Sequence, residues 1–415
     1  MALGLLVGGA GGLHAEELVV AHAAAGAVPA DEGPTTPIKV AVIGLGEQGR
    51  DLLASVVHVP GVEVAYVCDT YTPIHKRALA VTPKATAVTD YRKILDDKTV
   101  AAVFVETPSH QHKQIVLDAL AAGKHVYCEA PLASSFDDAR AIARAARDAG
   151  PRLLFHSGLQ QRTNPQHLHV LGFIEIGALG NVAQTKSQWH KKDSWRRTAP
   201  TDERQNALNW RLNRETSGGM MGEIGIHQVD VTSWFLKALP VSVSGYGGVV
   251  AWKDGRNVPD TVQCVFEYPN GIHLAYDATL ANSFDGAYEL FQGTDSAVLI
   301  RDGRAWMFKE SDAPQLGWEV YAYKEKIGDD TGIALVADAT KLLAQGLKPG
   351  ENRNTDPTRG SLFWAAHRFL ACVRESKPTG CGPLEGFHAT VAALKANEAV
   401  LTGSKITFTN DMFSL

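Results

Sequence analysis

A glycine-rich turn between the first strand and the first helix is the feature that most constrains the fold of this chain. The segment 38–46, IKVAVIGLG, is a short apolar run typical of a buried strand, and the helical pattern EQGRDLLASVVHV follows at once. Gly44, Gly46 and Gly49 form the pattern GxGxxG at this junction. The first glycine permits a tight turn, the second lets a pyrophosphate approach backbone amides, and the third allows close packing of helix on strand. The junction predicts a dinucleotide-binding unit, with Glu47 and Gln48 among the cofactor contacts.

The alternation of strands and helices continues beyond this unit. Apolar runs of strand length recur in VEVAYVCD, AAVFVET and HVYCEA, and a helical pattern, QIVLDALAAG, separates the last two. Strands that alternate with helices of this length imply a doubly wound parallel sheet, the Rossmann arrangement, here over residues 37–157.

Side chains that follow the strands complete the predicted cofactor site, because ligands bind outside the carboxyl ends of parallel strands. Asp69 ends the second strand, where its carboxylate would bind the adenosine ribose and repel a 2′-phosphate. This predicts NAD, although Lys76 and Arg77 lie close enough to keep NADP open. The loops after the fourth and fifth strands add the further predicted contacts Thr107, Pro108, His112 and Glu129.

The segment 217–236, SGGMMGEIGIHQVDVTSWFL, is the candidate for the chemistry. If it is helical, Glu223, His227 and Asp230 lie on one face, four and three residues apart. Two carboxylates would hold the imidazole in one tautomer and favour its charged form, so we predict these three as catalytic residues. A helix cap with a core histidine is the alternative. Imidazole and carboxylates also suit a transition metal, but the nucleotide cleft already explains the cluster, and no metal site is predicted.

Length and charge narrow the class of protein. A chain of 415 residues is too long for one ordinary domain, which favours two domains. Its 40 Lys and Arg are mixed with 45 Asp and Glu, for a net charge of −5. This balance argues against nucleic acid or an anionic membrane as a partner.

The first 36 residues form a separate leader and linker. Residues 2–30 are almost all apolar or small, and Leu13-His14-Ala15 resembles a signal-peptidase site. An export signal requires a basic residue before its apolar run, and no basic residue precedes this one. We expect an exported, periplasmic protein that does not insert into the membrane once the leader is removed; a cytoplasmic protein with a low-complexity arm is the alternative.

Five motifs in order, GLGEQG, CD, TPSHQH, AGKHVYCEAP and SGGMMGEIGIHQVD, resemble the Gfo/Idh/MocA family of NAD(P)-dependent sugar oxidoreductases, from about residue 38 to the C-terminus. The resemblance implies a Rossmann domain, a second α/β domain with a large, mostly antiparallel sheet, a bound nicotinamide cofactor and carbohydrate substrates. It also implies that His227 is the histidine of the family's DxxxH motif and that Glu129 begins its EKP motif.

The chain departs from the family pattern at two of these positions. Ala130 replaces the EKP lysine, so that EKP becomes EAP, and Glu223 replaces the DxxxH aspartate. Glutamate keeps the charge on a longer arm, whereas alanine removes a cation that would donate hydrogen bonds to the reacting hydroxyl and the cofactor. Loss of such a partner costs about two to four orders of magnitude in rate. A basic residue of the segment 188–197, QWHKKDSWRR, is the predicted substitute.

The second domain, residues 158–415, is expected to bind the substrate. Hairpin signals at Pro269-Asn270-Gly271 and Asp302-Gly303 join strand-like runs into an antiparallel sheet. One face of that sheet needs a cover, which predicts a homo-oligomer. Glycines 350 and 360 bracket a polar connection, and two amphipathic helices that follow are implied to pack back on the first domain. The predicted substrate residues are Gln160, Arg162, Trp189, His190 and Lys191.

Three functions remain open from the sequence. The first is an NAD-dependent oxidoreductase that moves hydride between the nicotinamide and a hydroxyl of a sugar, sugar derivative or glycoside, with His227 as acid and base. The second is a redox-neutral glycoside hydrolase that oxidises, eliminates, hydrates and reduces. The third is a non-catalytic sensor of sugar or nucleotide.

Overall fold

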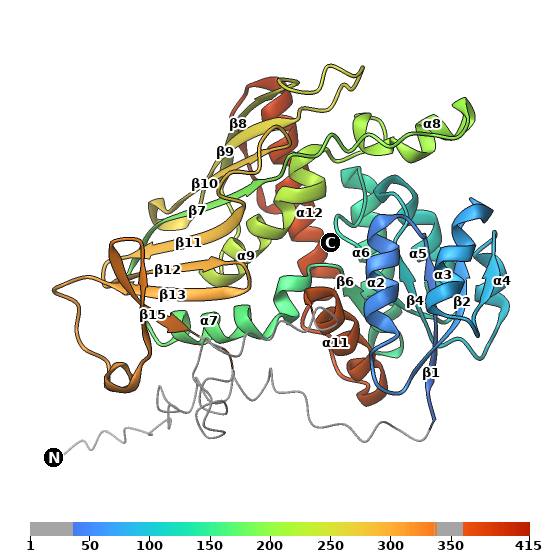
Figure 1. The fold of residues 1–415 in the computed structure, drawn as a ribbon, viewed down its shortest axis with the longest axis horizontal. Coiled ribbons are helices and arrows are strands. Elements are labelled where there is room, and N and C mark those ends of the chain that lie inside the picture. Colours follow the sequence, from blue (N-terminus) through green and yellow to red (C-terminus); the bar gives the residue numbers. More distant parts are fainter. Residues whose placement is uncertain (1–35, 336, 338–359) are drawn as a thin grey trace, which may run out of the picture.

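The computed structural model describes residues 36–335, 337 and 360–415, which form two sheets side by side with helices between and around them (Figure 1). Apart from Thr36, the predicted leader lies outside the described residues, and so does the predicted polar connection before Gly360. Among the helices that the structure describes, none combines the length and apolar character that a bilayer span requires.

The first sheet is the predicted Rossmann sheet. Its six strands are all parallel and have the order β3-β2-β1-β4-β5-β6, so the direction of winding reverses between β1 and β4. The strands are β1 (Ile38–Ile43), β2 (Val62–Cys68), β3 (Thr86–Val88), β4 (Ala102–Val105), β5 (His125–Cys128) and β6 (Phe155–Ser157). The helices that cover it are α2 (Glu47–Val56), α3 (His75–Val81), α4 (Arg92–Asp96), α5 (His112–Ala121) and α6 (Phe136–Ala149).

The second sheet is large and mostly antiparallel, as predicted. Its order is β14-β15-β13-β12-β11-β7-β10-β9-β8-β16, and among its pairings only β7 with β10 is parallel within the described residues. Both predicted hairpins are present, joining β9 to β10 and β12 to β13. The strands are β7 (Val182–His190), β8 (Ser242–Gly248), β9 (Thr261–Glu267), β10 (His273–Thr279), β11 (Ala287–Gly293), β12 (Ser296–Arg301), β13 (Arg304–Lys309), β14 (Lys324–Ile327), β15 (Asp330–Leu335) and β16 (Ile406–Thr407).

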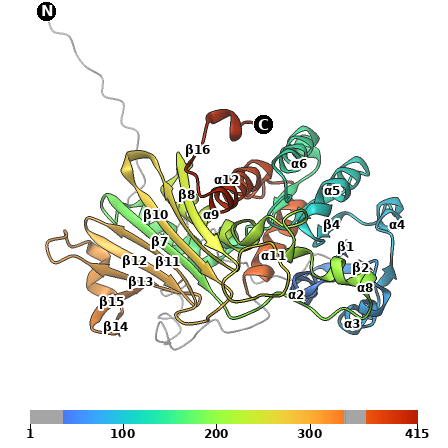
Figure 2. The same ribbon diagram turned by 90° about the horizontal axis from the view of Figure 1, so that it is seen from above.

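Three helices of the second half of the chain lie between the two sheets in both views (Figures 1 and 2). They are α9 (Ile226–Leu236), α11 (Ser361–Glu375) and α12 (Pro383–Thr402), while α7 (Pro165–Glu175) and α8 (Asp202–Leu208) lie outside this layer. Helix α12 contacts α6 of the first half and β8 of the second sheet, and α11 packs on α2. The division between residues 157 and 158 itself stays a prediction.

The contact of α11 with the first sheet is aromatic. Phe369 is fully buried, and its ring centroid lies 5.6 Å from that of Phe104 on β4 and 6.0 Å from that of Tyr127 on β5. The last part of the chain therefore completes the core of the first domain.

Phe369→Ala should lower the free energy of unfolding by about 3–5 kcal/mol, because it removes a buried ring and leaves a cavity under two strands. Urea unfolding measures this loss. The matched control is Leu384→Ala on α12, where a 43% exposed side chain is truncated and little change is expected. Equal effects of the two substitutions would contradict this description of the core.

Candidate active site

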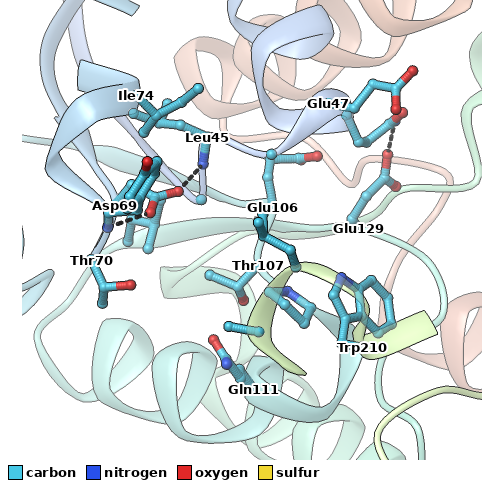
Figure 3. Close-up of a pocket in the computed structure, with 18 of the residues that line it drawn as sticks. Leu45, Glu47, Asp69, Thr70, Ile74, Glu106, Thr107, Gln111, Glu129 and Trp210 are labelled. Carbon is cyan, nitrogen blue, oxygen red and sulfur yellow. Dashed lines mark hydrogen bonds between the residues drawn. The ribbon is translucent and has the colours of Figure 1, made fainter. Parts of the chain in front are cut away.

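A cavity of about 510 Å³ lies at the carboxyl ends of the strands of the first sheet. The turns after β1, β2, β4 and β5 form one side, and residues of the second half of the chain form the other (Figure 3). Most of the predicted cofactor residues line it: Gly44, Gly46, Glu47, Gln48, Asp69, Thr107, Pro108, His112 and Glu129.

The three glycines fit a bound dinucleotide for three different reasons. Gly44 has φ +100°, and a Cβ there would lie 2.6 Å from the backbone carbon of Glu106. A Cβ on Gly49 would lie 2.0 Å from the carbonyl oxygen of Gly44, so α2 packs on the turn only with glycine. A Cβ on Gly46 would meet nothing within 4 Å, which leaves the space over this turn free for a phosphate.

Asp69 lies at one end of the cavity and Glu129 at the other (Figure 3). The carboxylate of Asp69 accepts hydrogen bonds from the backbone N–H of Leu45, at 2.9 Å, and of Tyr71, at 2.8 Å. These bonds hold a negative charge where the adenosine ribose is expected, which favours NAD over NADP, although Arg77 lines the same cavity. This end is the adenosine end, and the Glu129 end is therefore the nicotinamide end.

The loops at the nicotinamide end are fixed by buried polar contacts. Glu129 accepts hydrogen bonds from the side chain of Gln48 and, at 2.9 Å, from the backbone N–H of Ala130. The ring nitrogens of His112 lie 2.8 Å from the carbonyl oxygen of Thr107 and 3.1 Å from that of Pro131. Burial lowers the pKa of His112, and the facing carbonyl oxygens oppose that shift. A neutral ring donates from only one of its nitrogens, so it hydrogen-bonds to one of the two loops and packs against the other.

Glu223 joins the two halves of the site. Its Oε1 accepts hydrogen bonds from Ser109 Oγ and from the backbone N–H of Gly218, both at 3.1 Å, and its Oε2 lies 3.6 Å from Nε of Arg211. Burial raises the pKa of Glu223, and Arg211 opposes that shift. Of the three predicted catalytic residues, only Glu223 lines the cavity.

The prediction of a helix over residues 217–236 is confirmed from Gly219 onward, but the helix is not a regular α-helix throughout. Met221–Gly225 is a π-helix, and the α-helix α9 begins at Ile226. Small residues allow this wide turn, because a Cβ on Gly225 would lie 2.7 Å from the Met221 side chain. Glu223 and His227 therefore do not stack in the regular α-helical manner expected from their spacing, and such π-turns often occur at functional sites.

The prediction that two carboxylates favour the charged form of His227 is also corrected. Nδ1 of His227 is buried without a hydrogen-bond partner among the described residues, and burial lowers the pKa of His227 to about 4. Glu223 is engaged as described above, and Asp230 is paired with Arg162. His227 is therefore a neutral imidazole at pH 7.

Asp230 and Arg162, predicted as a catalytic and a substrate residue, form an ion pair with each other. Two nitrogens of the Arg162 guanidinium donate to the two carboxylate oxygens at 2.8 and 2.9 Å, and Asp230 is only 3% exposed. This bidentate ion pair connects α9 to the 3₁₀ helix Gln160–Thr163. Both carboxylate oxygens of Asp230 are thereby engaged by Arg162.

The other predicted substrate residues do not line the cavity: Gln160, Trp189, His190 and Lys191. Trp189 packs against the main core, and His190 is hydrogen-bonded to Asp277 and to the carbonyl oxygen of Phe284. In the part of the chain that the structure describes, no three His, Cys, Asp or Glu side chains could together hold a metal ion.

The segment 191–216, here called the strap, runs from the end of β7 to the first domain (Figure 1). Sequence reasoning named its beginning, residues 191–197, as a source of substrate contacts and of a substitute cation, but it missed the rest of the strap and its contacts with the first domain. Arg197 forms an ion pair with Glu47 at 2.9 Å, and the Arg204 guanidinium lies 4.4 Å from the centre of the Tyr71 ring. The carbonyl oxygen of Thr216 lies 3.1 Å from Nδ1 of His110. No motif marks these residues; the cluster of arginine and tryptophan in the strap was the only available signal.

Arg211 of the strap is a cation that interacts with both Glu129 and Glu223. It lines the cavity, stacks 4.8 Å from the centre of the Trp210 ring, and lowers the pKa of both Glu129 and Glu223. Arg196, from the segment predicted to replace the missing lysine, pairs instead with Asp254 at 2.9 Å.

The fold and the cleft together define a two-domain, dinucleotide-dependent oxidoreductase. The chain belongs to the GFO/IDH/MocA family: residues 38–156 match the oxidoreductase family with an NAD-binding Rossmann fold, and residues 167–296 match the GFO/IDH/MocA C-terminal domain. Its cofactor is NAD, which the glycine turn and Asp69 fit.

Relatives of this chain include several sugar-acting proteins. An uncharacterized oxidoreductase of Streptococcus pneumoniae is 25% identical over 89% of this chain and 95% of its own length. A 2,7-anhydro-N-acetylneuraminate hydratase of Escherichia coli is 24% identical over 63% of this chain and 67% of its own length. A levoglucosan dehydrogenase of Pseudarthrobacter phenanthrenivorans is 24% identical over 56% of this chain and 64% of its own length. A solved levoglucosan dehydrogenase with NADH and levoglucosan has a TM-score of 0.73 at 19% identity, covering 90% of this chain and 99% of that one, and supports the fold.

Gly46→Val should weaken NADH binding at least about tenfold, equivalent to about 1.4 kcal/mol, because the side chain would fill the space left for a phosphate. The backbone at Gly46, with φ −58°, accepts any residue, so the unfolding free energy should hardly change. Fluorescence titration with NADH measures the affinity. Gly317→Val is the control, since a Cβ there also meets nothing within 4 Å but lies outside the cavity. Unchanged affinity in Gly46→Val would contradict the placement of the cofactor.

Proposed function

We propose that this protein is an NAD-dependent oxidoreductase that oxidises a hydroxyl of a sugar, sugar derivative or glycoside. One observation carries the proposal: the dinucleotide turn and the buried carboxyls Glu129 and Glu223 line the same cavity. The cofactor supplies a hydride acceptor when bound. The protein supplies the site that binds it, the groups that orient the substrate and a base.

His227 is the proposed acid and base. Burial lowers its pKa to about 4, so the ring is neutral from about pH 5 upward and is in the form that accepts a proton, as a weaker base than a free imidazole. Its unpartnered Nδ1 is a buried polar atom that a ligand or an ordered water would satisfy.

Arg211 takes over part of the role of the family's EKP lysine, which Ala130 replaces in this chain. A guanidinium cannot act as a base, because it stays protonated, but it can donate hydrogen bonds and stabilise negative charge that develops on a substrate oxygen. Its stacking on Trp210 and its approach to Glu223 hold it in one orientation. In this proposal proton transfer rests with His227 and charge stabilisation with Arg211.

A redox-neutral glycoside hydrolase, which oxidises, eliminates, hydrates and reduces, is the second candidate. The strap favours this reaction. Arg197 contacts the glycine turn and Arg204 contacts the adenosine end, so the strap would slow the exchange of the cofactor between turnovers. A relative named as a hydratase also fits a reaction without net oxidation. The third candidate, a sensor, is supported by Ala130 alone.

A product assay separates the candidates. With levoglucosan, inositols, free sugars and aryl glycosides in turn, a dehydrogenase increases absorbance at the reduced-nicotinamide band in proportion to product. A hydrolase releases the aglycone with no net NADH. Absence of either signal on every substrate, with NAD bound, would support the sensor.

His227→Ala should lower the rate on the substrate so found by about two to four orders of magnitude, because the proposed base is lost. NADH affinity should stay within about twofold, since the side chain lies outside the cofactor cavity. Stopped-flow reduction of bound NAD measures the rate. His273→Ala, at an exposed position on β10, is the control. Turnover at the wild-type rate in His227→Ala would refute the assignment.

Two proposals concern the surroundings of the protein. Tyr246 on β8 is 70% exposed and Val265 on β9 is 47% exposed, which supports a homo-oligomer that forms through the second sheet. A monomeric mass measured by light scattering would contradict this proposal.

The apolar leader supports export, with the cytoplasm as the alternative, and fractionation of cells decides between the two locations.

A further inference from the structure

Two buried carboxyl groups lie side by side at the nicotinamide end of the cavity. Val105 of β4 pairs with Cys128 of β5, and the next residues on these parallel strands are Glu106 and Glu129. The backbone N–H of Glu129 donates to the carbonyl oxygen of Val105 at 3.1 Å, so the register continues past the strand ends. Neighbours in register on parallel strands point to the same face. Both side chains line the cavity (Figure 3).

The hydrogen bonds of the two carboxyls are unequal. Glu129 is 8% exposed and accepts the two hydrogen bonds from Gln48 and Ala130. Glu106 is 6% exposed, and both of its carboxyl oxygens are buried with no hydrogen-bond partner among the described residues. A buried carboxylate without a donor is costly, whereas a protonated carboxyl can donate to a neighbouring carboxylate.

The groups around the two carboxyls provide little positive charge to stabilise their ionised forms. Arg211 faces Glu129 from the strap and lowers its pKa, but burial dominates and raises that pKa to about 7. Burial and the charge of Glu129 together raise the pKa of Glu106 well above its usual range. On β5, the Tyr127 hydroxyl and the Cys128 thiol stay neutral, because burial and the two carboxyls raise their pKa values. Adjacent buried carboxyls of this kind titrate as one unit.

We propose that Glu106 and Glu129 share one proton near neutral pH and release part of it when the oxidised cofactor binds. Glu106 is thereby a proton-holding residue of this site, in a chain that has alanine where its family has lysine. The inference rests on the binding of NAD and not on the reaction proposed above.

The direction follows from the charge of the cofactor. The oxidised nicotinamide ring is positive and the reduced ring is neutral, while the rest of the dinucleotide is the same. A positive charge beside the pair favours its ionised form, so NAD⁺ should release a proton that NADH does not. By linkage, the affinity for NAD⁺ relative to NADH should rise with pH, by up to about tenfold per pH unit for one proton.

Calorimetry of NAD⁺ and NADH binding tests this proposal in two buffers of different ionisation enthalpy, at pH 6, 7 and 8. At pH 8 the full-length protein should release at least ~0.3 more protons on binding NAD⁺ than on binding NADH. In Glu106→Gln, which keeps the shape of the side chain, Glu129 is the only carboxyl left and is already ionised at pH 8. The difference should therefore fall below about a third of the wild-type value.

Glu289→Gln is the matched control. Glu289 is also 8% exposed, burial also raises its pKa to about 7, and it lies on β11 away from the cavity. This variant should keep the wild-type difference. Equal proton release with NAD⁺ and NADH in the wild-type protein, or a wild-type difference in Glu106→Gln, would overturn the proposal. Because the wild-type comparison needs no variant, it decides the matter even if Glu106→Gln fails to fold. If neither nucleotide binds, the cofactor assignment fails as well, and the two failures are thereby distinguished.

Discussion

The close approach of the glycine turn to the end of β4 is the constraint on which the rest of the structure depends. Gly44 and Gly49 leave no room for a side chain against Glu106 and against the turn itself, so β1, α2 and β4 meet without spacers. This contact lies where the winding of the sheet reverses, and it opens the cavity directly above it. Glu106, whose backbone and Cβ meet these glycines, carries one carboxyl of the buried pair. The same packing therefore creates the cofactor site and the unusual carboxyl pair beside it.

The second half of the chain completes the site by reaching across to this turn. The strap contacts the glycine turn through Arg197 and the adenosine end through Arg204. The exposed ion pair of Arg197 with Glu47 contributes at most about 1 kcal/mol, so it orients the strap more than it stabilises the protein. Glu223 provides the deeper link, because its buried carboxylate accepts a hydrogen bond from Ser109 of the first domain. Substrate and cofactor groups thus depend on contacts between the two halves.

The fold was largely predictable from sequence, and the site only in part. Both sheets follow from short-range patterns: the glycine turn, the period of apolar residues, and the hairpin residues Asn270 and Asp302, which have the positive φ that such turns use. The cofactor turn was predictable for the same reason. The partners of Asp230 and the contacts of the strap were not, because they join residues far apart in the chain. The state of His227 was also missed, since helical spacing says nothing of burial, and burial decides its pKa.

A crystal structure of the protein with NADH tests the central claim most directly. We predict that the adenosine lies beside Asp69 and Tyr71, that the pyrophosphate lies over Gly46, and that the nicotinamide lies next to Glu129 beneath the strap. A dinucleotide bound outside this cavity, or bound in it with the nicotinamide at the Asp69 end, would contradict the account.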